Sequence, residues 1–420
     1  MCRMFEEAGV RPTAIAACAL LVFSLLIAAS ARASSANETP PLIILEGPAL
    51  AQTKQRLQTG DATLAPSLNR LKRDADRALL GGTFSVTEKD ITSPSGDKHD
   101  YTSIAPYWWP NPKTANGLPY VRRDGEVNPE RDQTSDRKRL DNMVQTVKTL
   151  ALGYFFTDRE TYAAQAAKTL QAWFLDAATK MNPHLRYAQS IPGRNQGRGD
   201  GIIETHNLPE LLDSVGLLAG SKSWAETDHE QLRNWFNSYL TWLIESPEGK
   251  TEAKADNNHG TWYDVQIAGF GLFVGRGELA RKVTGEFGAK RIAKQIEPDG
   301  RQPRELGRTL GWNYAVFNLE ALFNAAAIAE RLGVDLWNFQ TEDNRSIRRG
   351  LDWLIPFATG AKPWPYKQIS AFQPEKLAPL LRRAALQYRE PSYEQTIGKI
   401  SKLNGNERWR LIYAKIPESK

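Results

Sequence analysis

Two short segments of this 420-residue sequence contain the residue types that could move a proton next to a carboxylate. Asn258 and His259 stand together in the segment ADNNHGTWYD, just before an apolar run. Arg308 and Tyr314 stand six residues apart in the segment RELGRTLGWNY. An imidazole or a phenol can exchange a proton once it is positioned and tuned. An amide and a guanidinium can stabilise negative charge that develops beside them.

These four side chains suit a β-elimination from a uronate unit of a polysaccharide. The C5 proton of a uronate is weakly acidic while the neighbouring carboxylate keeps its charge, so a site must stabilise the aci-anion that builds up. Asn258 and Arg308 suit that task. The reaction also needs a base near C5 and an acid near the leaving glycosidic oxygen, and His259 and Tyr314 are the candidates.

Each of these residues also has a structural interpretation. The Asn-Asn-His-Gly segment could be a turn that caps a helix, because Asn caps well and Gly tolerates unusual dihedral angles. Arg308 could be a surface ion-pair partner, and Tyr314 could be a core residue with a satisfied hydroxyl. The functional interpretation is favoured by their occurrence together, downstream of an aromatic-rich loop.

Two further segments interrupt the helical pattern and contain aromatic and basic side chains. They are residues 92–120, rich in Pro, Gly and aromatics, and residues 190–206. Aromatic faces can stack on sugar rings, and arginine forks pair with carboxylates. The alternative is that the tryptophans belong to the core and that Arg198 is a solvated loop residue. The candidates for substrate binding are Lys98, His99, Tyr101, Tyr107, Trp108, Trp109, Arg194, Arg198 and His206.

The elements that must position these residues are predicted to be helices. Apolar residues recur at three- and four-residue steps through much of the chain, whereas the alternation typical of strands is scarce. Many helices joined by short polar links predict an all-α fold, an (α/α) toroid of antiparallel helix pairs. Helices are expected over residues 140–155, 162–174, 232–243, 312–332, 344–355 and 378–388.

The N-terminus has the features of an export signal. An apolar run, residues 13–30, follows two arginines, and Ala31-Arg32-Ala33 supplies a small-x-small cleavage pattern. We predict a signal peptide over residues 1–33, a linker and first helix over 34–60, and one catalytic domain over 61–420. An uncleaved membrane anchor is the alternative, because the run is close to the roughly 18 residues needed to span a bilayer. The mature protein is expected to be periplasmic or secreted, with no stable membrane insertion.

Composition and charge exclude several other classes of protein. Both cysteines, Cys2 and Cys18, lie in the predicted signal, so the mature chain has no thiol chemistry. The five histidines lack the spacing of metal ligands, which predicts no metal site and no cofactor. The net charge of +6 is compatible with an anionic partner. Scattered basic residues without a recognition motif argue against nucleic acid. The expected partner is an acidic polysaccharide or oligosaccharide.

Four segments of the chain resemble the alginate lyase superfamily of α-helical toroid enzymes. They occur in order, and the likeness continues to about residues 362–364, so it covers most of the mature chain. The segments are SPSGDKHDYTSIAPYWWPNP (93–112), GRGDGIIETHNLPELLDSVGLL (197–218), ADNNHGTWYDVQIAG (255–269) and RELGRTLGWNYAVFNLEAL (304–322).

The resemblance implies a role for each of the four central residues. In that family an Asn-His pair, an Arg and a Tyr form the catalytic group. Carried over to this sequence, Asn258 and Arg308 contact the substrate carboxylate. His259 becomes the base, and Tyr314 becomes the acid or the combined acid and base. The implied activity is that of a polysaccharide lyase acting on a uronate polymer such as alginate, polymannuronate or glucuronan.

The sequence departs from the family pattern at three positions between Arg308 and Tyr314. Leu310, Gly311 and Asn313 stand where members often have Arg, Ser and His. Because Arg308 and Tyr314 keep their spacing, the departure affects the expected substrate more than the expected chemistry.

Two other functions compete with the lyase. A glycoside hydrolase on a similar toroid would need two acidic residues flanking the scissile bond, and Asp256, Asp264 and Glu305 are available. A hydrolase mechanism would assign no role to the Asn-His and Arg-Tyr groups. A periplasmic oligosaccharide-binding protein would need aromatic and basic cleft residues but no acid and base pair.

Overall fold

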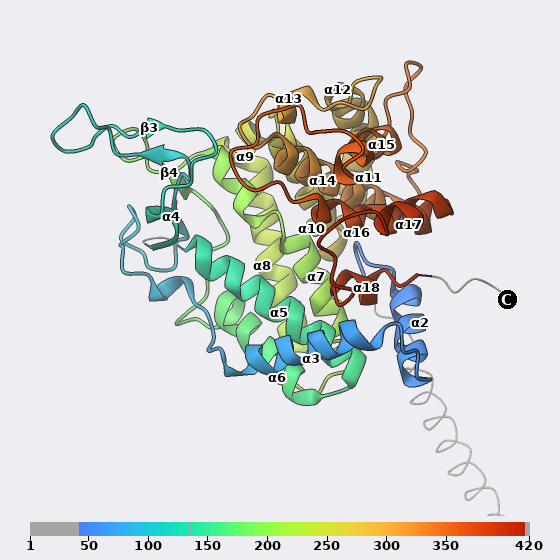
Figure 1. Cartoon of the computed structure of the whole chain (residues 1–420). Coiled ribbons are helices and arrows are strands. Elements are labelled where there is room, and N and C mark those ends of the chain that lie inside the picture. The colour runs from blue at the N-terminus through green and yellow to red at the C-terminus, as the bar shows by residue number, and fades with distance from the viewer. Residues whose placement is uncertain (1–41, 134–135, 416–420) are drawn as a thin grey trace, which may run out of the picture. The chain divides into compact units, whose positions relative to one another are not determined.

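Helices dominate the part of the chain that the computed structural model describes, residues 42–133 and 136–415 (Figure 1). The expected all-α class is therefore confirmed. The predicted signal peptide, residues 1–33, lies outside the described residues. Within the described ranges, no helix is both long and apolar enough to cross a membrane.

The most buried helices form an inner layer. They are α5 (Arg137–Thr157), α7 (Leu208–Leu217), α10 (Asn258–Phe273), α14 (Gly311–Arg331) and α16 (Ala378–Gln387). In α10 and α14 most residues are buried around the whole circumference, which is typical of a helix packed on all sides. In sequence order α5 contacts α7, α7 contacts α10 and α10 contacts α14. Hydrogen bonds from Arg383 then join α16 to α14.

A second set of helices packs on the outside of this layer. They are α3 (Ala65–Leu80), α6 (Glu160–Leu170), α8 (Glu226–Glu245), α11 (Gly277–Phe287), α15 (Ile347–Ala358) and α17 (Pro391–Ile397). Each contacts an inner helix: α3 and α6 contact α5, α8 and α11 contact α10, α15 contacts α14, and α17 contacts α16. Links such as the one from α5 to α6 are too short for anything but antiparallel neighbours. Successive antiparallel pairs are the arrangement expected for an (α/α) toroid.

Helix ends follow local sequence signals where these are strong. α14 ends at Arg331, and Gly333 follows with φ +73°, a left-handed conformation that glycine adopts without strain. α15 begins after Ser346, whose hydroxyl accepts from the N–H of Arg349. The helix predicted over residues 344–355 begins three residues later and continues past Pro356 to Ala358, so this proline lies inside the last turn.

The remaining helical elements lie before, between and after the helices of the two layers. They are α2 (Gly47–Gln58), α4 (Glu130–Gln133), α9 (Pro247–Glu252), α12 (Ala293–Gln295), α13 (Pro303–Leu306), α18 (Trp409–Ile412), the 3-10 turns η1 (Val86–Glu88), η3 (Gly199–Thr205) and η5 (Pro374–Leu377), and the π turns η2 (Gln171–Leu175) and η4 (Gly288–Ile292). Helix α2, in the segment expected to be a linker and first helix, packs against α18.

Two small sheets shape the non-helical segments. Strand β1 (Thr102–Ile104) pairs in parallel with β4 (Tyr187–Ser190). Strand β2 (Trp108–Trp109) pairs antiparallel with β3 (Val121–Arg122), so that Trp108 lies opposite Arg122. We call residues 105–126, which contain β2, β3 and the loop between them, the hairpin segment.

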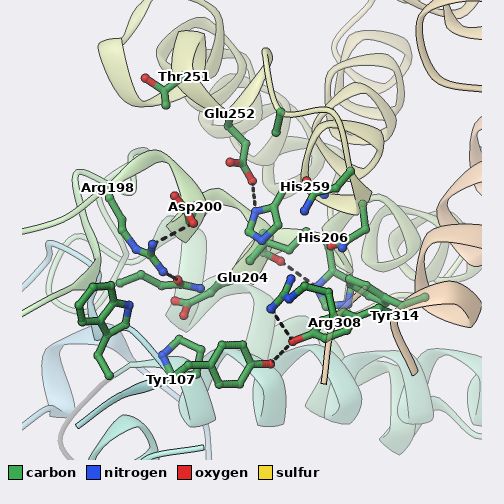
Figure 2. A pocket seen from close by; sticks show the side chains of 18 of the residues that line it. Tyr107, Arg198, Asp200, Glu204, His206, Thr251, Glu252, His259, Arg308 and Tyr314 are labelled. Atoms are coloured by element: carbon green, nitrogen blue, oxygen red, sulfur yellow. Dashed lines mark hydrogen bonds and ion pairs between the residues drawn. The ribbon is translucent and has the colours of Figure 1, made fainter. Parts of the chain in front are cut away.

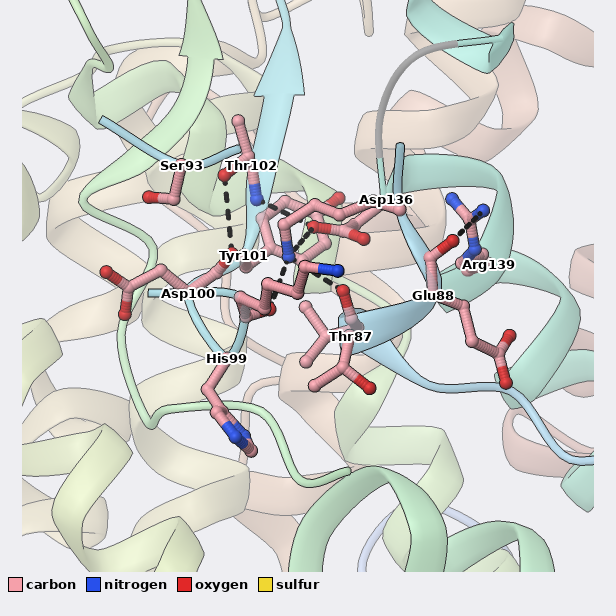
Figure 3. A network of polar contacts seen from close by, with 12 residues as sticks. Thr87, Glu88, Ser93, His99, Asp100, Tyr101, Thr102, Asp136 and Arg139 are labelled. Atoms are coloured by element: carbon pink, nitrogen blue, oxygen red, sulfur yellow. Dashed lines mark hydrogen bonds and ion pairs between the residues drawn. The ribbon is translucent and has the colours of Figure 1, made fainter. Parts of the chain in front are cut away.

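A buried ion pair lies beside strand β1, which precedes the hairpin segment, and Figure 3 shows the polar contacts around Thr102 and Asp136. Lys89 Nζ lies 3.1 Å from Asp136 Oδ2, and both side chains are fully buried. Hydrogen bonds offset part of the cost of burying such a pair, although no described group hydrogen-bonds to Asp136 Oδ1. Asp136 accepts from the N–H of Thr102 at 2.9 Å and donates its own N–H to the carbonyl of Thr102. Residues 102 and 136 are therefore held together at the start of β1.

Candidate active site

A cavity of about 640 Å³ opens between the hairpin segment, η3, the start of α10 and the start of α14 (Figure 2). Its volume lies in the range of ordinary ligand sites. The four central residues predicted from the sequence all line it. The lining side chains that carry polar groups are Tyr107, Trp108, Arg122, Arg131, Arg137, Gln189, Arg198, Asp200, Glu204, His206, Thr251, Glu252, Lys254, Asn257, Asn258, His259, Arg308 and Tyr314.

The Asn-Asn-His-Gly segment is both a helix start and a wall of the cavity. Asn257 is the N-cap of α10, and its side chain accepts from the N–H of His259. A Cβ on Gly260 would lie 2.0 Å from the carbonyl oxygen of Ala255 and 2.2 Å from Arg291 Nη1. Glycine is required there because the preceding loop approaches so closely. The capping and functional interpretations therefore apply together.

His259 is held by a buried carboxylate. Its Nδ1 lies 2.6 Å from Glu252 Oε1, and Glu252 is 3% exposed. Burial alone would lower the pKa of His259, but the charge and hydrogen bond of Glu252 raise it above its ordinary value. With Nδ1 committed to Glu252, Nε2 is the ring nitrogen left for exchange with a ligand, and no described residue hydrogen-bonds to it.

Asn258 is anchored to a second buried carboxylate. Its backbone N–H donates to Glu305 Oε1 at 2.7 Å, and its Nδ2 donates to Glu305 Oε2 at 2.6 Å. Burial raises the pKa of Glu305, although the hydrogen bonds from Asn258 oppose that shift. One Nδ2 hydrogen of Asn258 remains for the cavity, since an amide nitrogen carries two.

Arg308 and Tyr314 meet across the link between α13 and α14. Arg308 Nη2 donates to the Tyr314 hydroxyl at 3.1 Å, and the guanidinium lies 4.3 Å from the centroid of the Tyr314 ring. The Tyr314 hydroxyl donates to the Tyr107 hydroxyl at 2.6 Å. Burial and then the interaction with the Tyr107 hydroxyl raise the pKa of Tyr314, so its hydroxyl keeps its proton in the unliganded cavity.

Four of the nine predicted binding residues line the cavity: Tyr107, Trp108, Arg198 and His206. Arg198 donates to Gln189 at 2.7 Å and pairs with Asp200 at 2.9 Å. His206 Nδ1 contacts the carbonyl of Ile203 at 2.9 Å. Burial and the charge of Arg137 lower the pKa of His206 to about 4, so its imidazole is neutral near pH 7.

The other five predicted binding residues do not line the cavity. Tyr101 is fully buried and donates to Glu204 at 2.8 Å, so it supports the cavity floor instead of contacting a ligand. Trp109 donates its indole N–H to the carbonyl of Glu126 at 3.0 Å. The remaining three are Lys98, His99, which contacts the carbonyl of Lys180, and Arg194, which stacks on Trp108 at 5.0 Å.

Several cavity residues had no distinguishing signal in the sequence. Arg137 is the first residue of α5, and its Nη1 lies 3.9 Å from the buried Glu204 Oε1. Glu252 precedes His259 by seven residues, but a turn separates α9 from α10, so no helical spacing relates them. Only the folded chain brings such residues to the cavity.

The cavity carries an excess of positive charge. Its lining includes six basic side chains, Arg122, Arg131, Arg137, Arg198, Lys254 and Arg308, against the three acids Asp200, Glu204 and Glu252. A cleft of one predominant charge concentrates ligands of the opposite charge. Among residues 42–133 and 136–415, no three His, Cys, Asp or Glu side chains gather in a way that could hold a metal ion.

A basic cleft with an imidazole, a phenol, an amide and a guanidinium, on paired helices, is the arrangement expected of a polysaccharide lyase. Comparison with known proteins gives the family. The alginate lyase family model matches residues 85–364, and the chain belongs to that family. No match was found among the curated proteins.

Solved structures agree with this assignment. An alginate lyase from Bacteroides ovatus is 41% identical, with 89% of this chain and 99% of that chain covered and a TM-score of 0.86. Alginate lyase A1-III from Sphingomonas species A1 is 16% identical over 87% of this chain and 95% of that chain, with a TM-score of 0.57. That second likeness concerns the fold alone and confirms the expected (α/α) toroid. A variant of the same enzyme complexed with tetrasaccharide matches at 15% identity, covers 88% of this chain and 95% of that chain, and has a TM-score of 0.56.

Proposed function

We propose that this protein cleaves a uronate-containing polysaccharide, alginate or polymannuronate or glucuronan, by β-elimination. The observation that carries the proposal is the meeting of His259, Arg308 and Tyr314 in one basic cavity. The similarity to an alginate lyase from Bacteroides ovatus supports it, as does the tetrasaccharide bound to a variant of A1-III. The signal-like N-terminal sequence supports action in the periplasm or outside the cell.

In the proposed reaction, Asn258 and Arg308 stabilise the substrate carboxylate. The remaining Nδ2 hydrogen of Asn258 and the Nη1 group of Arg308 are the available donors. As the C5 proton leaves, negative charge builds up on the carboxylate oxygens. Fixed hydrogen-bond donors therefore stabilise the transition state more than they stabilise the ground state.

The proton transfers fall to His259 and Tyr314. His259 Nε2 takes the C5 proton, the electron pair of the C5–H bond forms the C4=C5 double bond, and the C4–O4 bond breaks. The Tyr314 hydroxyl donates its proton to the departing O4. Glu252 strengthens His259 as a base by stabilising the imidazolium. An alternative assignment gives both proton transfers to Tyr314.

The hydrolase alternative finds less support in the cavity. Asp256, Asp264 and Glu305 do not line it. Asp264 is buried against Arg291 at 2.7 Å, and Glu305 is committed to Asn258. A pair of facing carboxyl groups is therefore lacking among these three candidates.

The proposal is tested with purified mature protein and a panel of polymannuronate, polyguluronate, glucuronan and glycosaminoglycans. Ultraviolet absorbance from a new C4=C5 double bond on one or more of the uronate polymers is the expected result. New reducing ends without that absorbance would indicate a hydrolase, and binding without either product would indicate a binding protein.

A further inference from the structure

A carboxylate from the hairpin segment lies against Arg308, although the two residues are 184 positions apart. Asp124 Oδ1 accepts from Arg308 Nε at 3.1 Å and from Nη2 at 2.7 Å, and Oδ2 accepts from Nε at 3.2 Å. The two side chains are 23% and 20% exposed. Such a two-oxygen contact fixes the plane of a guanidinium as well as its position.

The next residue of the chain strengthens this contact. The Thr309 N–H donates to Asp124 Oδ2 at 3.2 Å. The Thr309 hydroxyl is placed 2.8 Å from the Asp124 carbonyl oxygen and 3.0 Å from Oδ2. Asp124 is therefore tied to residues 308 and 309 through its side chain and its backbone.

Gly125 allows the hairpin segment to approach this closely. Its φ is +78°, and a Cβ there would lie 2.3 Å from Thr309 Oγ1 and 3.0 Å from Ile369 Cδ1. Both the backbone conformation and the lack of space require glycine. Asp124 thus supplies the hydrogen bonds of this contact, and Gly125 supplies the backbone conformation and the space that it needs.

The contact determines which hydrogens of Arg308 remain available. Nε and one Nη2 hydrogen are directed to Asp124, and the other Nη2 hydrogen is directed to the Tyr314 hydroxyl. Nη1 donates to no described residue. Arg308 lines the cavity but Asp124 does not. Arg122, which also lines the cavity, donates from Nη2 to Asp124 Oδ1 at 2.7 Å. Asp124 can therefore act on a ligand only through the two arginines that it contacts, and Arg308 is the one with the two-oxygen contact.

Asp124 keeps its charge over the useful pH range. Burial alone would raise the pKa of Asp124, but hydrogen bonds from Arg308 and Thr309 and the charge of Arg308 lower it to about 2. The orientation of Arg308 by Asp124 is thus unchanged from mildly acidic to alkaline pH.

We propose that Asp124 is a positioning residue for the elimination: it holds the Arg308 guanidinium so that Nη1 faces the substrate carboxylate while Nη2 stays on the Tyr314 hydroxyl. The inference rests on the proposed function of the cavity and adds a residue from a distant segment to it. Arg308 is then correctly oriented only when residues 124 and 125 are docked on residues 308 and 309.

The test compares Asp124→Ala and the isosteric Asp124→Asn with the wild type on the polymer that the wild type cleaves best. A donor misplaced by about 1 Å can cost about 100-fold in rate, so kcat should fall by about 10- to 100-fold. KM should change by less than about threefold, since an interaction made mainly in the transition state is lost. Added formate or acetate should restore part of the activity of Asp124→Ala, which a purely structural role would not allow.

Glu126→Gln is the matched control, because it removes a carboxylate charge from the same segment. Glu126 is 55% exposed on its side chain and lies 3.9 Å from Arg123. Its kinetics should equal those of the wild type. If Asp124→Ala does not fold, Asp124→Asn carries the test, since it preserves size and shape.

Wild-type kcat in a folded Asp124 variant would overturn the inference. So would a faster variant with a lower KM, because Asp124 would then compete with the substrate for Arg308. An inactive wild type would overturn the proposed function and this inference together, whereas an active wild type with an equally active variant overturns this inference alone.

Discussion

The Tyr314 hydroxyl lies at the junction of the charge-stabilising and proton-transferring groups. Arg308 Nη2 donates to it, and it donates to Tyr107. Its raised pKa keeps the proton on the phenol, which suits an acid that protonates a departing oxygen. In the assignment that gives Tyr314 both proton transfers, Arg308 would have to stabilise the phenolate.

We predict that Tyr314→Phe lowers turnover by about 100- to 10,000-fold, the usual scale for a lost general acid or base. The ring and its stacking on Arg308 remain, and the two hydrogen bonds of the hydroxyl are lost, so stability should fall by only about 1 kcal/mol. Tyr393→Phe is the control, since its hydroxyl contacts Asp352 at 2.7 Å outside the cavity. It should cost about 1 kcal/mol of stability and leave turnover intact. Normal double-bond formation by Tyr314→Phe would remove Tyr314 from the mechanism.

The Glu252–His259 pair makes a prediction about pH. A base must be deprotonated to act, so kcat/KM should rise with pH through the raised pKa of His259. Glu252→Gln removes the charge that raises this pKa. The acidic limb of the pH profile should therefore move to lower pH, and kcat at the optimum should fall. A limb that stays in place would show that His259 is not the base. A wild-type rate that falls as pH passes this pKa would instead indicate that His259 acts as a cation.

At the level of elements, the start of α10 combines structure and function. The Asn257 cap, the Asn258 contact with Glu305 and the close approach at Gly260 all act on the first turn, which carries His259. Arg291 completes the arrangement by donating to the carbonyls of residues 253 and 255.

Gly260→Ala should destabilise the protein by about 1–3 kcal/mol, because a Cβ cannot fit without moving backbone. Gly285→Ala in α11 is the control, since a Cβ there meets nothing within 4 Å. It should stabilise by up to about 1 kcal/mol. Chemical denaturation measures both changes. Equal stability of the two variants would mean that the loop before α10 moves easily, and the positioning of His259 would need another explanation.

Helices with a clear polar face or a strong end signal were the most predictable from the sequence. The stripe in α5 and the Gly333 end of α14 are local signals, and both helices were predicted within one to three residues. α7 was not predicted. Eight of its ten residues are buried, so no polar face contrasts with an apolar one.

The residues of the site also differ in how far the local sequence predicts them. His259 with Asn258, and Arg308 with Tyr314, are local pairs whose chemistry can be predicted from the residue types. Asp124 and Glu252 reach the site through tertiary packing, and their carboxylates resemble any other in the sequence. In the predicted aromatic loop, Tyr107 and Trp108 line the cavity, whereas Tyr101 is fully buried and lies outside the lining.

At the scale of the whole described chain, a partly buried polar network joins the inner helices outside the active-site cavity. Lys148 of α5 pairs with Glu210 of α7, and Asn324 of α14 donates to Glu210 at 3.2 Å. Arg383 of α16 donates to Asn324 at 2.7 Å. Four inner helices are thus connected by one chain of contacts, with Glu210 at its centre.

Glu210→Gln tests this connection, because it keeps the shape of the side chain and removes its charge. Lys148 would then lose its charged partner at a place where both side chains are about a quarter exposed, so the loss of the pair should cost about 1–3 kcal/mol. Burial alone would raise the pKa of Glu210, but Lys148 lowers it to about 2. A depressed pKa in the folded state means that the pair stabilises the protein above the unfolded pKa, about 4.5. That contribution is lost as pH falls toward about 2. The difference in the free energy of unfolding between wild type and variant should therefore be largest near neutral pH and should vanish in acid.

Glu286→Gln, at an exposed position of α11, is the control and should change the free energy of unfolding by less than about 0.5 kcal/mol. A pH-independent gap would place the effect in packing instead of charge. Turnover of the folded variant should match the wild type, since Glu210 does not line the active-site cavity.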